Sequence, residues 1–227
     1  MNLKRIECFD HIANTESSHP TDDVPWLILF HGFGADAHDL EGLKDFFQFK
    51  SPVNLRFPNG VFEVPIGPGW TGRAWWPLRL TSLPEDWSNY TPAEMQQLVP
   101  ALLKMIQDLK VPWNKIILGG FSQGAMLATE LYLQAPETPM GLVSLSGSLI
   151  RQSEWKNQLS KRKGCKVLLS HGQNDQVLPV KGSQKLMALF QENGLHCKWV
   201  TFSGGHEIPV KVIESINNYV NELTTQN

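Results

Sequence analysis

Six continuous apolar runs, each of strand length, constrain the fold more than any other feature of this sequence. Between them lie stretches whose apolar residues recur at helical spacing. A strand that is apolar on both faces is typical of a mostly parallel sheet with helices on both sides. The sequence therefore predicts an α/β fold. The apolar runs lie at 26–30, 54–58, 115–119, 141–146, 166–170 and 198–202, and the helical stretches at 92–110, 123–135, 180–193 and 207–223.

The length of the chain fits one domain. With 227 residues it can bury roughly 70% of the surface that its unfolded form would expose, so one core forms without metal or disulfide crosslinks. No internal repeat, low-complexity tract or linker divides the sequence. We therefore expect residues 1–227 to form a single domain, in which the segment around Cys8, before Pro20, adds an antiparallel edge strand.

Charge and hydropathy exclude several kinds of partner. The net charge is only −2 and neither end of the chain carries a run of like charge, so we do not expect nucleic acid to bind. No segment approaches the ~18 apolar residues that span a bilayer, and the first twenty residues lack the apolar core of a signal peptide. The three scattered cysteines suit reduced thiols. These features indicate a cytoplasmic protein without membrane insertion, acting as a monomer or a homodimer.

The segment Gly120–Gly124, with the sequence GFSQG, has the pattern of a nucleophilic serine. It follows an apolar run and precedes a helical stretch, which is the strand, sharp turn and helix order of a nucleophile elbow. The turn requires a strained backbone at Ser122, and the flanking glycines leave no side chains to clash. We expect Ser122 to be the nucleophile. The alternative is a glycine-rich turn with an incidental serine.

A serine hydroxyl needs a neighbouring base to take its proton. Among the seven histidines, His206 is the best candidate, because it follows the run at 198–202 through a flexible Ser-Gly-Gly turn and so lies at the carboxyl edge of the sheet. His31 and His171 precede glycines at strand ends, and we expect them to be buried and hydrogen-bonded to loop backbone. The others are expected in the amino-terminal segment, on a surface helix or in a turn: His11, His19, His38 and His196.

The imidazole in turn needs a carboxylate that fixes its tautomer, and in this type of fold the acid lies between serine and histidine in the chain. Asp175 satisfies this order and closes the loop directly after the run at 166–170. Glu154 is an alternative, although it lies away from a strand end. Glu207 is adjacent to His206, which makes it hard for the carboxylate to reach the ring.

Two backbone amides are expected to bind the oxyanion of the reaction. The amide of Gln123 directly follows the nucleophile, and that of Phe33 lies in the loop after the run at 26–30. Backbone amides suit this role because they cannot rotate away. An ordinary strand-to-helix turn is the alternative for the Phe33 loop.

Residues 59–90 interrupt the alternation of runs and contain four of the eight tryptophans. Loops of this length are functional or disordered, and disordered segments contain few aromatic residues. We therefore expect a lid or substrate loop that forms an apolar acyl pocket. The expected pocket residues are Trp70, Trp75, Trp76, Leu78, Leu80 and Trp87, with Arg73 and Arg79 at the rim. The alternative is that the tryptophans only hold a long loop against the core.

With Ser122, Asp175 and His206 placed, the sequence resembles the phospholipase/carboxylesterase family of small α/β-hydrolases, which includes the acyl-protein thioesterases. The resemblance implies a cofactor-free serine hydrolase with this triad and with oxyanion donors at Phe33 and Gln123. Its substrates would be small carboxylic esters, thioesters or lysophospholipids. Residues 67–80 depart from the family pattern, because this segment is longer and richer in tryptophan than the short Trp-containing loop of the eukaryotic thioesterases. The matching segments lie at 30–36, 119–128, 145–147, 170–179 and 203–208.

The predicted reaction requires no metal. Neither a His-Glu-x-x-His pair nor a close Cys/His cluster offers zinc-ligand spacing. Two alternatives remain open at this stage. One is an enzyme of the same fold that uses the same serine on lactones or on carbon–carbon bonds, and the other is a non-catalytic binding protein on a hydrolase scaffold.

Overall fold

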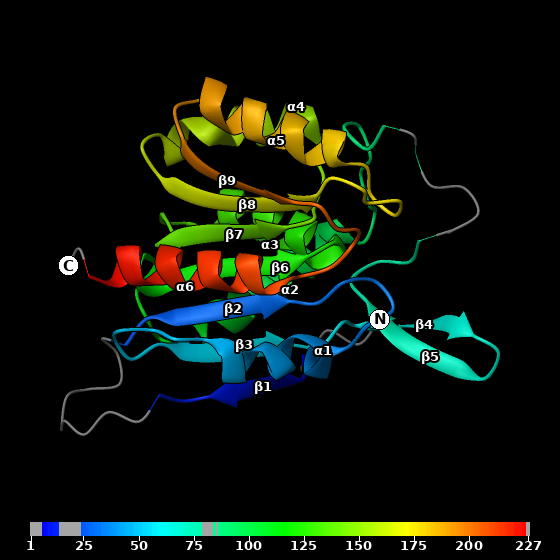
Figure 1. Cartoon of the computed structure of the whole chain (residues 1–227), viewed down its shortest axis with the longest axis horizontal. Helices are drawn as coiled ribbons and strands as arrows, with labels where there is room; N and C mark the ends of the chain where they lie inside the picture. The colour runs from blue at the N-terminus through cyan, green and yellow to red at the C-terminus, as the bar shows by residue number, and fades with distance from the viewer. Residues whose placement is uncertain (1–5, 14–23, 79–83, 85, 226–227) are drawn as a thin grey trace.

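A mostly parallel sheet of seven strands lies at the centre of the protein (Figure 1). The structure is a computed structural model that describes residues 6–13, 24–78, 84 and 86–225. The sheet has the order β1-β3-β2-β6-β7-β8-β9, in which β1 pairs antiparallel with β3 and the other pairs are parallel. This arrangement confirms the predicted α/β class and the predicted edge strand. The strands are β1 Cys8–His11, β2 Trp26–Phe30, β3 Asn54–Pro58, β6 Ile116–Phe121, β7 Gly141–Leu145, β8 Lys166–Gly172 and β9 His196–Phe202.

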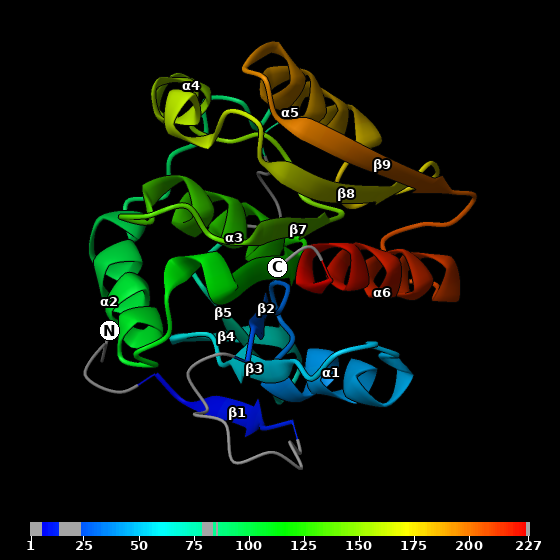
Figure 2. The ribbon, with the colours of Figure 1, turned by 90° about the vertical axis from the view of Figure 1, so that its left-hand side faces the viewer.

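Both faces of the central strands are buried, because alternate side chains enter different cores. On β2, Trp26, Ile28 and Phe30 pack in one core, and Leu27 and Leu29 pack in the other. The first core is shared with α2, α3, α4 and α5, and the second with α1 and α6. Figure 2 shows α1 and α6 on the opposite side of the sheet from α2, α3 and α4. The helices are α1 Ala37–Glu41, α2 Met95–Gln107, α3 Gln123–Gln134, α4 Gln152–Gln158, α5 Val180–Glu192 and α6 Val210–Thr224.

None of the helices in the described part of the chain is long and apolar enough to cross a bilayer.

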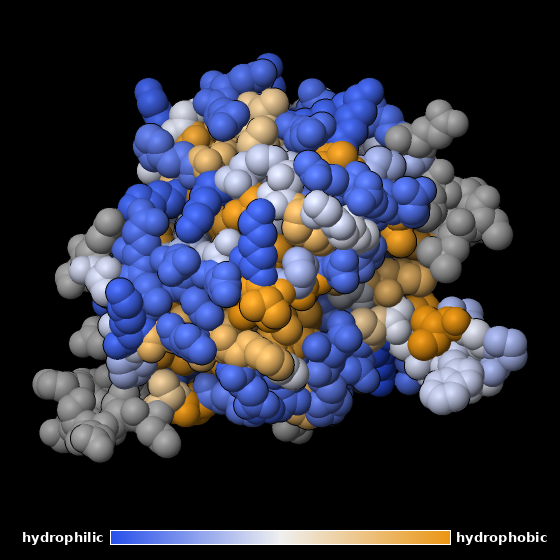
Figure 3. Space-filling model, viewed as in Figure 1, coloured by the Kyte–Doolittle hydropathy of each residue, from blue (hydrophilic) through white to orange (hydrophobic). Residues whose placement is uncertain are grey.

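Part of the tryptophan-rich segment is a β-hairpin, where the sequence suggested an irregular loop. Strands β4 (Phe62–Gly67) and β5 (Trp70–Ala74) pair antiparallel outside the main sheet. The sequence does not reveal these two strands, because most of their side chains are exposed and they therefore contain no apolar run. It projects from the rest of the surface, and apolar surface lies next to it (Figure 3).

The hairpin is joined to the body of the protein through the loop that follows β2. The Gly34 amide donates to the carbonyl of Arg73 at 2.8 Å, and the Arg73 amide donates to the carbonyl of Ala35 at 2.8 Å. A Cβ atom at Gly72 would come within 1.9 Å of the Gly34 oxygen, so only glycine allows this approach. The hairpin therefore fixes the backbone of the loop that carries Phe33.

Candidate active site

Ser122 occupies a sharp turn between β6 and α3. Its backbone has φ 56° and ψ −118°, and its amide donates to the Leu145 carbonyl at 2.8 Å. The turn requires its glycines: a Cβ atom would lie 2.4 Å from the Gly124 oxygen at Gly120, and 2.0 Å from the Phe30 oxygen at Gly124. The serine is thus presented at the carboxyl end of a central strand with little freedom to move.

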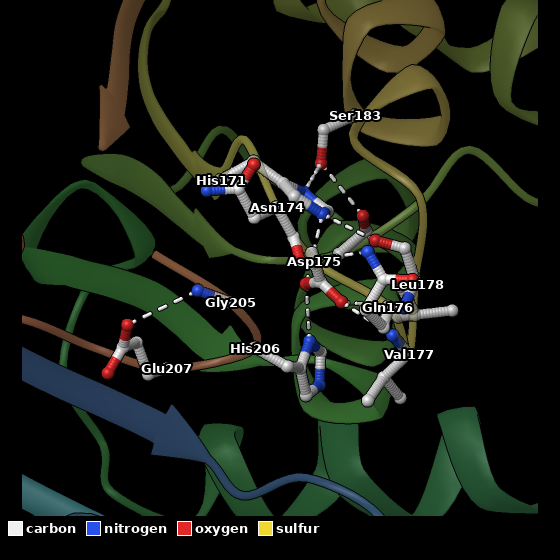
Figure 4. A network of polar contacts seen from close by, with 11 residues as sticks. His171, Asn174, Asp175, Gln176, Val177, Leu178, Ser183, Gly205, His206 and Glu207 are labelled. Atoms are coloured by element: carbon white, nitrogen blue, oxygen red, sulfur yellow. Dashed lines mark hydrogen bonds and ion pairs between the residues drawn. The ribbon is translucent and has the colours of Figure 1, made fainter. Parts of the chain in front are cut away.

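Asp175 and His206 meet because the loops after β8 and β9 are tied together. The Gln173 amide donates to the Phe202 carbonyl, and the Asn174 amide to the Gly204 carbonyl, both at 2.9 Å. These bonds bring Nδ1 of His206 to 2.6 Å from Oδ2 of Asp175 (Figure 4). The Nδ1–H group donates to the carboxylate, which leaves Nε2 of His206 available as a proton acceptor.

The Asp175 carboxylate is held from its other side as well. Its Oδ1 atom accepts the backbone amides of Val177 and Leu178, each at 2.8 Å. The side chain is fully buried, so these amides supply hydrogen bonds that water cannot. The ring of His206 packs against Phe121, with a centroid distance of 4.6 Å. Both members of the pair are therefore fixed in orientation.

Ser122 and His206 line one pocket of about 280 Å³, together with Phe33 and Gln123. Gln123 is the first residue of α3, where an amide has no carbonyl partner within the helix. The side chain of Gln123 is buried. Its Oε1 atom accepts a hydrogen bond from the Trp75 amide at 2.9 Å, and its Nε2 atom donates to the Trp76 carbonyl at 2.8 Å. Most other lining residues are apolar: Leu78, Trp87, Phe121, Met126, Val177 and Leu178.

A profile of the Phospholipase/Carboxylesterase family matches residues 13–224. The chain belongs to the phospholipase/carboxylesterase family. It is therefore an enzyme, a member of a hydrolase family of carboxylesterases and thioesterases, as the sequence predicted.

Named relatives and a solved structure agree with this membership. The acyl-protein thioesterase 1 homolog 1 of Dictyostelium discoideum is 25% identical over 203 residues, which are 86% of this chain and 89% of that protein. Carboxylesterase SOBER1 of Arabidopsis thaliana is 26% identical over 207 residues, with the same coverage. The crystal structure of esterase PE8 superposes with a TM-score of 0.81, covers 96% of this chain and 99% of that chain, and is 24% identical. The last comparison shows the shared α/β-hydrolase fold.

The two buried histidines at strand ends take up the backbone contacts expected of them. His31 donates from Nδ1 to its neighbour Gly32 at 2.7 Å and accepts the Gly60 amide on Nε2 at 2.8 Å. Burial lowers the pKa of His31, so the ring stays neutral. His171 contacts the Leu178 carbonyl at 2.7 Å, and it also contacts Asp175, which the sequence did not suggest.

The two alternative acids do not reach the His206 ring. Glu154 lies exposed on α4, and the Glu207 carboxylate accepts the Gly205 amide at 3.2 Å (Figure 4).

The structure corrects the expected position of three tryptophans. Trp75 and Trp76 are fully buried and do not line the pocket, because Trp75 is held by a bond from its Nε1 atom to the His31 carbonyl at 2.8 Å and by packing against Phe30. Trp70 is 73% exposed on the hairpin. Trp75 and Trp76 thus hold their segment against the core, which was the alternative interpretation.

Other predicted pocket residues have mixed outcomes. Leu78 and Trp87 do line the pocket. Arg73 lies in β5 and pairs with Glu63 at 3.5 Å. Leu80 and Arg79 lie outside the described residues.

Several lining residues were missed by reasoning from sequence. Phe121 precedes Ser122, Met126 lies one helical turn after it, and Val177 and Leu178 follow Asp175 closely. Their proximity to the predicted triad was the signal that would have found them. One charged residue, Asp39 of α1, also lines the pocket, and burial raises the pKa of this carboxyl group. Within the described ranges, no group of three or more histidine, cysteine or acidic residues is placed to hold a metal ion.

Proposed function

We propose that Ser122, Asp175 and His206 form the catalytic triad of a single-domain serine hydrolase that cleaves carboxylic esters or thioesters. The contact of 2.6 Å between Asp175 and His206, beside a serine at a strained strand-to-helix turn in the same pocket, carries this proposal. A carboxylate that fixes the imidazole tautomer leaves Nε2 as the base that activates a serine.

In the proposed reaction, the Ser122 oxygen attacks the acyl carbon while His206 takes its proton. The amides of Phe33 and Gln123 donate to the oxyanion, and His206 then gives the proton to the departing alcohol or thiol. Water enters as that group leaves, loses a proton to His206 and attacks the acyl-enzyme. His206 then returns this proton to the Ser122 oxygen as the bond between that oxygen and the acyl carbon breaks, which releases the carboxylic acid and restores Ser122.

The pocket supports a small apolar acyl group as the substrate. Its volume of about 280 Å³ lies at the lower end of the range for ligand pockets, and its walls are mostly apolar. We therefore propose esters and thioesters of short or medium-length fatty acids as the substrate class.

The proposal is tested by labelling with a fluorophosphonate probe and by a panel of p-nitrophenyl esters, acyl thioesters and lysophospholipids of graded chain length. Ser122→Ala should abolish labelling and lower kcat by about 10⁶-fold, as loss of the serine does in other triad enzymes. A Ser122→Ala enzyme that keeps the label or substantial esterase activity would rule out the assignment.

A further inference from the structure

His171 is a buried contact of the proposed catalytic carboxylate that the reaction above does not use. Its side chain is fully buried, and its Nε2 atom lies 3.2 Å from Oδ2 of Asp175. That oxygen also accepts the Nδ1–H group of His206 at 2.6 Å. Two imidazoles from different elements, β8 and the loop after β9, therefore meet at one carboxylate oxygen (Figure 4).

The surroundings of His171 decide which ring nitrogen carries the proton. Nε2 faces two acceptors, the Leu178 carbonyl at 2.7 Å and the Asp175 carboxylate, so this nitrogen must be the donor. Nδ1 lies 2.7 Å from the hydroxyl of Ser183, which also lies 2.8 Å from the Gly147 carbonyl.

The hydroxyl of Ser183 has one proton, and its direction sets the charge of His171. If Ser183 donates to Nδ1, the ring is neutral. If Ser183 donates to Gly147 instead, Nδ1 needs a second ring proton and the ring is cationic. Burial lowers the pKa of His171, and the titratable groups that act on it are Asp175 and His206. In both states Nε2 carries a proton, which is what its contact with Asp175 requires.

We propose that His171 is a positioning residue for the triad, which supplies a second side-chain donor to Oδ2 of Asp175 and shares that oxygen with His206. This inference rests on the proposed function. Oδ1 accepts hydrogen bonds from the amides of Val177 and Leu178, and Oδ2 accepts one from His206 at 2.6 Å with Nε2 of His171 at 3.2 Å beside it. Polar contacts on both oxygens therefore oppose rotation of the carboxylate. The additional donor also disperses the charge of Oδ2, and so limits how strongly Asp175 stabilises the imidazolium of His206.

His171→Phe removes the donor and keeps a ring of similar size. We expect kcat to fall by about 10- to 100-fold, with KM within about threefold of wild type, because the carboxylate loses its alignment. The carboxylate, relieved of one donor, holds the imidazolium more strongly. The acidic limb of the profile of kcat/KM against pH should therefore move to higher pH.

Two further variants separate positioning from packing. His171→Gln returns an N–H group near the position of Nε2, and should bring both kcat and the acidic limb back toward wild type. Leu169→Val perturbs the buried part of β8 without touching Asp175, so it should lower the Tm and leave the acidic limb in place. An acidic limb that moves equally in Leu169→Val, or fails to move in His171→Phe, overturns the proposal.

A readout that needs no turnover is ¹⁵N NMR of histidine-labelled wild-type protein. We expect Nε2 of His171 to carry a proton at pH 7, and a proton on Nδ1 alone would overturn the proposal whether or not His171→Phe folds. If the wild-type enzyme lacks Ser122-dependent activity, the proposed function fails, while the NMR result still decides the contact between His171 and Asp175.

Discussion

The two walls of the pocket are built in different ways. One wall, which we call the triad wall, contains Ser122 and His206, with Asp175 behind His206. These residues lie on turns that leave β6, β8 and β9, neighbours or near neighbours in one sheet. On the other wall, the loop of Phe33 is held by the β4–β5 hairpin, which lies outside that sheet. The two walls are joined by the side chain of Gln123, which binds the backbone just after the hairpin.

This difference separates the chemistry from the shape of the pocket. The side chains of the proposed triad are fixed by parallel strands whose carboxyl ends share an edge, so a substitution there should affect activity on every substrate. The hairpin wall is fixed by a few backbone bonds and one close approach at Gly72. A substitution in the hairpin wall should therefore lower kcat less than one in the triad wall. Substitutions in the pocket lining should mainly change the preference for acyl chain length.

The largest effect is expected for Asp175→Asn on the triad wall. The amide cannot hold the required tautomer of His206, so kcat should fall by about 10⁴-fold, as the equivalent change does in other triads, with little change in KM. Steady-state kinetics on one soluble ester measures both constants. A loss of less than tenfold would show that the carboxylate does not orient the base.

An intermediate effect is expected for Gly72→Ala on the hairpin wall. The new Cβ atom would lie 1.9 Å from the Gly34 oxygen and must displace the loop of Phe33. Removal of one oxyanion donor lowers kcat by about 10²- to 10³-fold, which sets the upper bound for this variant.

Gly67→Ala is the matched control for Gly72→Ala. Gly67 lies on the same hairpin, where an added Cβ atom meets nothing within 4 Å. Equal activities of the two variants would mean that the hairpin does not position the oxyanion donors.

The smallest effect on rate is expected for Met126→Phe in the lining of the pocket. A larger side chain on α3 shortens the space for the acyl group. The kcat/KM ratio between an octanoyl and an acetyl ester should fall by about tenfold, whereas activity on the acetyl ester should change by less than about threefold. Trp70→Ala is the companion variant, because Trp70 is absent from the lining and its loss should leave the ratio unchanged.

The strands behind the triad wall, and the contact between Asp175 and His206, were the part that the sequence could predict. The strands β2 and β3 begin and end where the runs at 26–30 and 54–58 do. All five residues of β2 are apolar and buried, as expected for a strand covered on both faces, whereas β3 contains Arg56, which pairs with Asp10 of the edge strand β1. Asp175 and His206 were placed by their distance from such strand ends, and they lie in contact. Local sequence is sufficient here, because each side chain is close in the chain to the strand that positions it.

The hairpin wall could not be predicted in the same way. Of the side chains of β4 and β5, Val64 and Ala74 are buried, so no apolar period marks these strands. An aromatic residue is apolar whether it packs inward or lines a cavity, and composition therefore could not distinguish Trp75, in the core, from Trp87, in the pocket lining. The contact of His171 with Asp175 likewise depends on the path of a loop and not on a motif.

The positive φ of Ser122 has a consequence for how the protein resists heat. A residue with a Cβ atom in that region costs about 1–2 kcal/mol of folding free energy relative to its ordinary conformations, and glycine avoids most of this cost. A glycine at this position would therefore raise the melting temperature while removing the proposed nucleophile. Under the proposed function, catalytic activity and thermal stability make opposite demands on this one residue.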